Sequence, residues 1–92
     1  MNVESSLSAH AARRIRQRGI APALVERVLA YGREAFDHHG GMVVYVDRAT
    51  RESLRRRGAA GRDIDRLGGV YVVVADGAIV TVGHRYRRLR RR

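Results

Sequence analysis

The run Val-Tyr-Val-Val-Val-Ala at positions 70–75 constrains the fold more than any other feature of the chain. It is apolar throughout, with a Gly-Gly pair before it and Asp76-Gly77 after it. Asp-Gly is a strong signal for a two-residue hairpin turn, and a second β-branched run follows it. Because a strand without polar positions is typical of the centre of a sheet, we expect residues 70–75 to pair with both 79–82 and 42–46.

Two helices are expected before the first strand. Ser6 or Ser8 can cap the first helix, and Gly19 suits the left-handed residue that ends it. Pro22 suits the first position of the second helix, and Gly32 suits the position after its end. The apolar residues that these helices would bury are Leu7, Ala11, Ala12 and Ile15 in the first, and Leu24, Val25, Val28 and Leu29 in the second.

The rest of the chain alternates between strand and helix patterns. The expected elements are strands at 34–38 and 42–46, a polar helix at 49–57 capped by Asp47, a single turn at 63–67, and strands at 70–75 and 78–83. The order α-α-β-β-α-β-β predicts an α+β domain, with N-terminal helices packed on one face of a four-stranded antiparallel sheet. Either Val72 and Val74 or Val73 would face the helices.

Length and composition fit one domain. The chain has 92 residues, from which we expect a domain over 1–86 and an Arg-rich tail over 87–92. The absence of cysteine excludes disulfides, a thiol nucleophile and cysteine-based zinc sites. No segment reaches the roughly 20 apolar residues of a membrane span, and the amino terminus does not resemble a signal sequence. We therefore expect a cytoplasmic protein without a membrane partner.

The charge points to a polyanionic partner. The formal net charge is +10, and all 19 basic residues are Arg. Such a field favours RNA, DNA or an acidic protein. Arginine is the better phosphate reader, although a GC-rich genome would produce the same bias. The expected nucleic-acid contacts are Arg13, Arg85, Tyr86, Arg87 and Arg88, unless the Arg-rich end is only a solvated arm.

His10, Arg14 and Arg18 recur at every fourth position of the first expected helix. This spacing places the three side chains along one helix face. A titratable imidazole in line with two cations is favourable if a phosphate bridges them, because guanidinium groups bind phosphate oxygens in pairs. The alternatives are a solvated basic face, or a buried His10 bonded to a carbonyl with Arg14 paired to Glu26 or Asp76.

The sequence lacks the motifs that several kinds of catalytic site require. His38 and His39 are adjacent, so in a strand they point to opposite faces and cannot chelate one metal together. The chain has no Gly-x-Ser-x-Gly nucleophile elbow and no Gly-rich phosphate loop. The carboxylates of Asp37, Asp47, Asp63, Asp65 and Asp76 occupy expected turn and cap positions. We therefore expect neither a metal nor a cofactor.

Metal-free cleavage of RNA is the activity that these residues still allow, because RNA supplies its own 2′-hydroxyl nucleophile. The reaction needs proton transfer and stabilisation of the charge on phosphorus. The expected proton carriers are His10 and His84, the charge stabilisers are Arg14, Arg18 and Arg85, and the orienting groups are Thr81 and Tyr86. Thr81 and His84 fall on opposite faces of the last strand unless it ends or bulges near Gly83.

The motif Ser8-x-His10-Ala11-x-x-Arg14-Ile15-x-x-Arg18-Gly19-Ile20, with Tyr31-Gly32 and Asp76-Gly77-x-Ile79-Val80-Thr81-Val82, resembles the bacterial domain-of-unknown-function family 4258. That family is similar to small ribonuclease toxins of the barnase, colicin and RelE type, in which N-terminal helices pack on a four-stranded sheet that carries the active site. The resemblance implies a metal-independent RNA-cleaving or RNA-binding domain and carries over His10, Arg14, Arg18 and Thr81. Where the family often has an aromatic pair after this threonine, the chain has Val82-Gly83-His84-Arg85-Tyr86.

We therefore expect a toxin-like endoribonuclease that acts on RNA (tRNA, mRNA or the ribosome). The first alternative is a non-catalytic RNA- or ribosome-binding module. The second is a basic protein that docks an acidic antitoxin-like partner.

Overall fold

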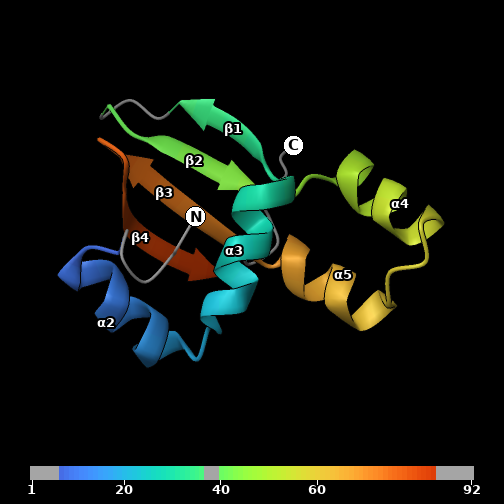
Figure 1. Ribbon diagram of the computed structural model, residues 1–92, viewed down its shortest axis with the longest axis horizontal. Helices are drawn as coiled ribbons and strands as arrows, with labels where there is room; N and C mark the ends of the chain where they lie inside the picture. Colours follow the sequence, from blue (N-terminus) through green and yellow to red (C-terminus); the bar gives the residue numbers. More distant parts are fainter. Residues whose placement is uncertain (1–6, 37–39, 85–92) are drawn as a thin grey trace.

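The computed structural model describes residues 7–36 and 40–84. Its elements in chain order are α2 (Ala9–Arg18), α3 (Pro22–Tyr31), β1 (Arg33–Phe36), β2 (Met42–Tyr45), α4 (Arg48–Arg56), α5 (Gly61–Gly68), β3 (Val70–Ala75) and β4 (Ala78–His84) (Figure 1). The α+β class and the expected order are confirmed, and the single turn expected at 63–67 is the helix α5. Residues 37–38 of the expected first strand and the tail at 87–92 lie outside the described residues.

The four strands form one antiparallel sheet in the order β1-β2-β3-β4. β3 pairs with β2 and β4, which confirms the prediction that the apolar run is central. The register of β4 shifts at one point: Val73 pairs with Thr81, but Val74 pairs with Ile79, so Val80 is an extra residue on β4. This bulge lies before Thr81 and leaves the rest of the strand in ordinary alternation.

The helix ends follow the expected capping residues. The side chain of Ser8 accepts a hydrogen bond from the Ala11 amide at 3.0 Å, and Gly19 ends α2 in the left-handed conformation with φ 66°. Asp47 caps α4 in the same way, through the Thr50 amide at 2.8 Å. Gly32 differs, because it is extended with φ −77°. It is constrained by space, since an added Cβ would lie 2.5 Å from the Val28 carbonyl oxygen.

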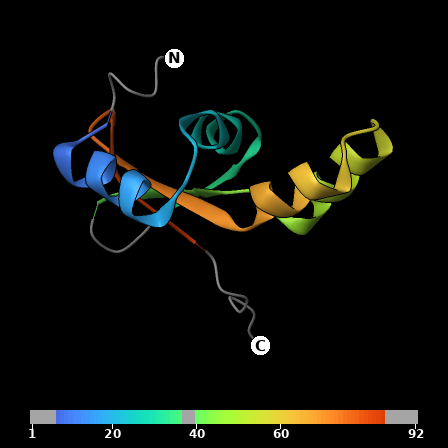
Figure 2. The same cartoon turned by 90° about the horizontal axis from the view of Figure 1, so that it is seen from below.

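The core lies between one sheet face and two helices. α2 packs along β4, and α3 packs over β2 and β3 (Figure 2). Val72 is fully buried in this core, and Val74 packs against it, whereas Val73 pairs with Thr81 on the opposite face. Val72 and Val74 are therefore the valines that face the helices. Each such apolar side chain contributes about 1.5–3 kcal/mol on burial.

α4 and α5 pack together beside one end of the sheet (Figure 1). Ile64 and Leu67 are the buried residues of α5, and this helix contacts both α3 and β3. In the part of the chain that the structure describes, no helix is long and apolar enough to cross a membrane.

Candidate functional site

His10 and Arg14 are in contact on α2, one helical turn apart. The Nε–H of Arg14 donates a hydrogen bond to Nε2 of His10 over 3.4 Å. His10 is exposed and Arg14 is partly buried. In this bond the Nε2 atom of His10 is the acceptor. The alternative in which His10 is buried is wrong, and Arg14 pairs with neither Glu26 nor Asp76 among the described residues.

The remaining basic residues of α2 extend this surface. Arg13 is exposed and Arg18 is partly buried, and neither forms an ion pair with a described carboxylate. Arg16 and Arg18 lie in the last turn, where a cation is also favoured by the helix dipole. We call His10, Arg13, Arg14 and Arg18 the α2 basic surface. Its uncompensated guanidinium groups favour phosphate contacts.

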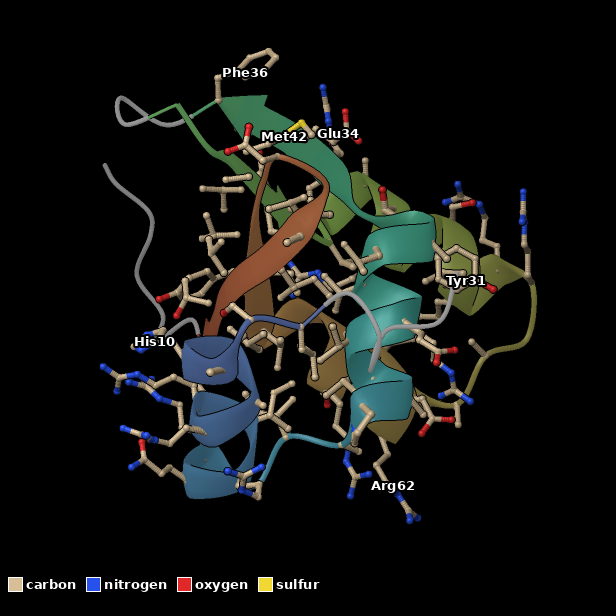
Figure 3. All side chains as sticks on the ribbon, turned by 60° about the vertical axis from the view of Figure 1, so that its left-hand side comes forward. His10, Tyr31, Glu34, Phe36, Met42 and Arg62 are labelled. Carbon is tan, nitrogen blue, oxygen red and sulfur yellow. The ribbon has the colours of Figure 1, made fainter. Side chains whose placement is uncertain are left out.

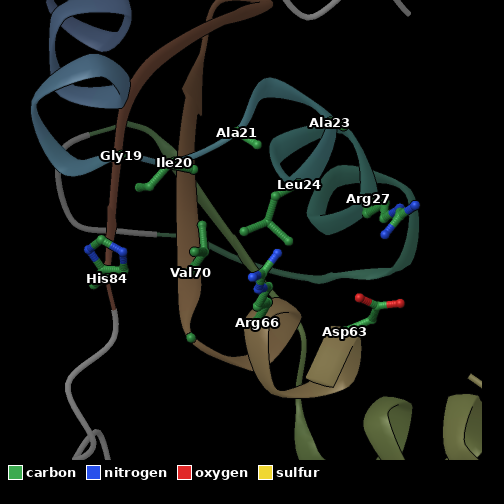
Figure 4. A pocket seen from close by; sticks show the side chains of 11 residues that line it. Gly19, Ile20, Ala21, Ala23, Leu24, Arg27, Asp63, Arg66, Val70 and His84 are labelled. Atoms are coloured by element: carbon green, nitrogen blue, oxygen red, sulfur yellow. The ribbon is translucent and has the colours of Figure 1, made fainter. Parts of the chain in front are cut away.

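A second candidate site is a cleft of about 460 Å³ between the start of α3, α5 and the end of β4 (Figure 4). Ile20, Leu24 and Val70 supply much of its apolar lining. Val70 pairs with His84 across β3 and β4, so both side chains lie on the sheet face that the helices cover. This pairing brings the imidazole of His84 to the cleft.

Three basic side chains from three elements line the cleft. They are Arg27 of α3, Arg66 of α5 and His84 of β4, and Asp63 is the only carboxylate among the lining residues. Figure 4 shows the Arg66 side chain below Leu24, with Val70 and His84 on one side and Arg27 and Asp63 on the other. Neither arginine forms an ion pair with a described residue. The cleft can therefore hold an anion beside a group that transfers protons.

The other predicted site residues lie elsewhere. Thr81 is on the sheet face opposite His84, because the bulge at Val80 precedes both residues and does not change their relative alternation. His10 is near the start of β4, where the Ser8 amide bonds to the Ile79 carbonyl oxygen. The cleft is at the other end of α2, about 13 Å further along the helix axis. Arg85, Tyr86, Arg87 and Arg88 lie outside the described residues.

The family described as Domain of unknown function (DUF4258) matches residues 7–84. The chain belongs to the DUF4258 family. The match covers the whole described part of the chain, including α2, the cleft and His84. Neither the curated proteins nor the solved structures contain a match to this chain.

The cleft of this DUF4258 domain contains two arginines that sequence analysis did not select. Arg27 lies on the polar face of the helix pattern expected for α3, which is typical of a solvent-exposed residue. Arg66 lies in a segment where only a single helical turn was expected. The docking of α5 against α3 brings them to one cleft, and no local pattern encodes that contact. Of the residues that line the cleft, only His84 was predicted as a site residue. The sheet face on which His84 lies depended on where β4 bulges.

Two carboxylates of the DUF4258 domain, Asp47 and Asp76, occupy structural positions in the described part of the chain. Asp47 caps α4 and also bonds Arg33 at 3.2 Å. The hydrogen bonds from Thr50, and then the nearby Arg33, hold the pKa of Asp47 below its ordinary value. Asp76 occupies the β3–β4 turn with φ 53°. Within residues 7–36 and 40–84, no three His, Cys, Asp or Glu side chains are close enough to hold a metal ion.

Proposed function

We propose that this DUF4258 domain is a toxin-like endoribonuclease that binds RNA in the cytoplasm and cleaves it without a metal. The observation that carries the proposal is the cleft in which His84 lies with Arg27 and Arg66. In 2′-hydroxyl transesterification an imidazole can transfer the proton, and two guanidinium groups can stabilise the charge on the phosphate. The resemblance to ribonuclease toxins of the barnase, colicin and RelE type supports the same reaction.

The reaction can be written with each group in a stated role. The neutral imidazole of His84 removes the proton of the 2′-hydroxyl, and the 2′-oxygen forms a bond to phosphorus. Arg27 and Arg66 stabilise the additional negative charge on the phosphate oxygens. The bond to the 5′-oxygen breaks, and that oxygen takes a proton from solvent at the open side of the cleft. The products are a 2′,3′-cyclic phosphate and a 5′-hydroxyl, and His84 returns its proton to solvent.

The α2 basic surface has a binding role in this proposal. Arg13, Arg14 and Arg18 contact RNA phosphates, and His10 holds the Arg14 guanidinium through its Nε2 atom. The proposal also assigns RNA contacts to the residues that follow His84 in the sequence, namely Arg85, Tyr86, Arg87 and Arg88. Thr81 takes no part in the proposed reaction, because it lies on the sheet face opposite His84. The alternative arrangement uses His10 for proton transfer, with Arg14 and Arg18 as the charge stabilisers.

The test is incubation of purified protein with total RNA in EDTA, followed by mapping of the new ends. We expect 2′,3′-cyclic phosphate and 5′-hydroxyl ends, and no cleavage at a site that carries a single 2′-deoxynucleotide. Arg66→Gln should slow cleavage about 10²-fold or more. Arg62→Gln is the matched control, because Arg62 is an exposed residue of the same helix and does not line the cleft.

The outcomes separate the candidate functions. Salt-sensitive RNA binding without new ends would favour a non-catalytic RNA- or ribosome-binding module. Absence of RNA binding would favour the second alternative, in which the α2 basic surface docks an acidic antitoxin-like protein.

A further inference from the structure

Phe36, the only phenylalanine of the chain, is 86% exposed at the end of β1. Its partner in the register is Met42, and Glu34 pairs with Val44 on the same face of the sheet. Figure 3 shows Phe36, Met42 and Glu34 gathered at one end of the sheet. A large exposed aromatic side chain beside other apolar groups is typical of an interaction surface.

A groove of about 540 Å³ lies between α3 and strands β1 and β2, and its lining includes Met42, the register partner of Phe36. Leu29, Met42 and Val74 give it a predominantly apolar lining. Since β1 is at the edge of the sheet, a ligand can approach the groove without displacing a strand. We call Phe36 and this groove the β1 groove.

The charge of the β1 groove is opposite to that of the chain. Its only charged lining residues are Glu26 and Glu34, although the chain has 19 arginines and nine carboxylates. Neither glutamate forms an ion pair with a described residue. This local inversion disfavours RNA, whose phosphates would meet two carboxylates. It also disfavours a symmetric dimer through the groove, because that arrangement would place glutamates against glutamates.

We propose that the β1 groove docks a segment of a different protein that carries both apolar and basic residues. Apolar side chains of the segment would cover Phe36 and enter the groove, and its cations would pair with Glu26 and Glu34. The residues of α3 that line the groove are Glu26, Leu29 and Ala30, whereas those that line the His84 cleft are Ala23, Leu24 and Arg27, so the two sites share no lining residue. The proposal therefore does not depend on the RNA-cleaving function.

The first experiment places p-benzoylphenylalanine at position 36 of the full chain and irradiates the cells that make it. We expect cross-linking to one protein other than this chain, through a segment with apolar residues and a positive net charge. Cross-linking to a second copy, to RNA or to no protein would overturn the proposal, and so would an acidic segment.

The second experiment titrates the cross-linked segment, as a synthetic peptide, into the full chain labelled with 4-fluorophenylalanine. The single phenylalanine gives one fluorine resonance in the β1 groove. We expect a saturable shift, and about tenfold weaker binding by the double variant Glu26→Arg, Glu34→Arg, because two attractive pairs become repulsive. Glu52→Arg is the control, since Glu52 is exposed on α4 outside the groove. Equal affinity for the wild type and the double variant would overturn the proposal.

Discussion

Val70 and His84 are directly paired across β3 and β4, and the pairing puts an imidazole on the face of the sheet that α2 and α3 cover. Val70 is buried there, whereas His84 remains partly exposed at the cleft. Thr81, three residues earlier, is on the opposite face. Because Thr81 and His84 are an odd number of positions apart on β4, they lie on opposite faces, and only His84 lies with Arg27 and Arg66.

Gly32→Ala should destabilise the fold by about 1–3 kcal/mol, as other overpacking substitutions do. The added methyl group would lie 2.5 Å from the Val28 carbonyl oxygen and 2.6 Å from Cγ1 of Val44. Gly61→Ala is a matched control in α5, where nothing lies within 4 Å of the added Cβ. That change should be neutral or stabilising by up to about 1 kcal/mol. Urea unfolding measures both, and equal stability of the two variants would contradict the packing described at Gly32.

The Asp47→Asn variant tests the cap of α4 through the pH dependence of the free energy of unfolding. Because the folded-state pKa of Asp47 is lowered, its ionised form adds stability that is present above the unfolded-state value, near 3.8. That stability is lost as the pH falls through the folded-state pKa. The wild type should therefore be more stable than the Asn variant at pH 7, and the difference should shrink below about pH 4. A difference in the free energy of unfolding that stays constant from pH 7 to pH 2 would contradict this role.

Binding to single-stranded RNA should weaken steeply with salt. Each phosphate contact contributes about 0.7 to the slope of log affinity against log salt. Arg13→Gln should lower the slope by about one contact, and Arg56→Gln, on the exposed side of α4, should leave it unchanged. Truncation after Tyr86 should lower the slope further without a change in melting temperature. An affinity for RNA that is independent of salt would refute this description of the α2 basic surface.

His10→Ala should act on binding more than on chemistry. It removes the imidazole that accepts the Arg14 Nε–H, so the guanidinium loses one restraint on its orientation. We expect weaker RNA binding and a nearly unchanged rate of cleavage at saturating protein. A loss of about 10²-fold in that rate, with binding retained, would instead support the arrangement in which His10 transfers the proton.

Local signals in the sequence predicted the fold well. Ser8, Gly19 and Asp47 cap helices where their side-chain and backbone chemistry indicated, and the Asp76–Gly77 turn joins the predicted strands. Each of these features depends only on residues that are close together in the sequence. The candidate site is different, because the convergence of Arg27, Arg66 and His84 depends on how α5 docks against α3. Such long-range contacts leave no periodic pattern in the sequence.

The most direct test of the central claim is single-turnover cleavage by His84→Gln, measured with saturating protein in EDTA. If His84 transfers the proton, the rate should fall about 10²-fold or more, while RNA affinity and melting temperature stay close to those of the wild type. A folded His84→Gln protein that cleaves RNA at the wild-type rate would contradict the claim.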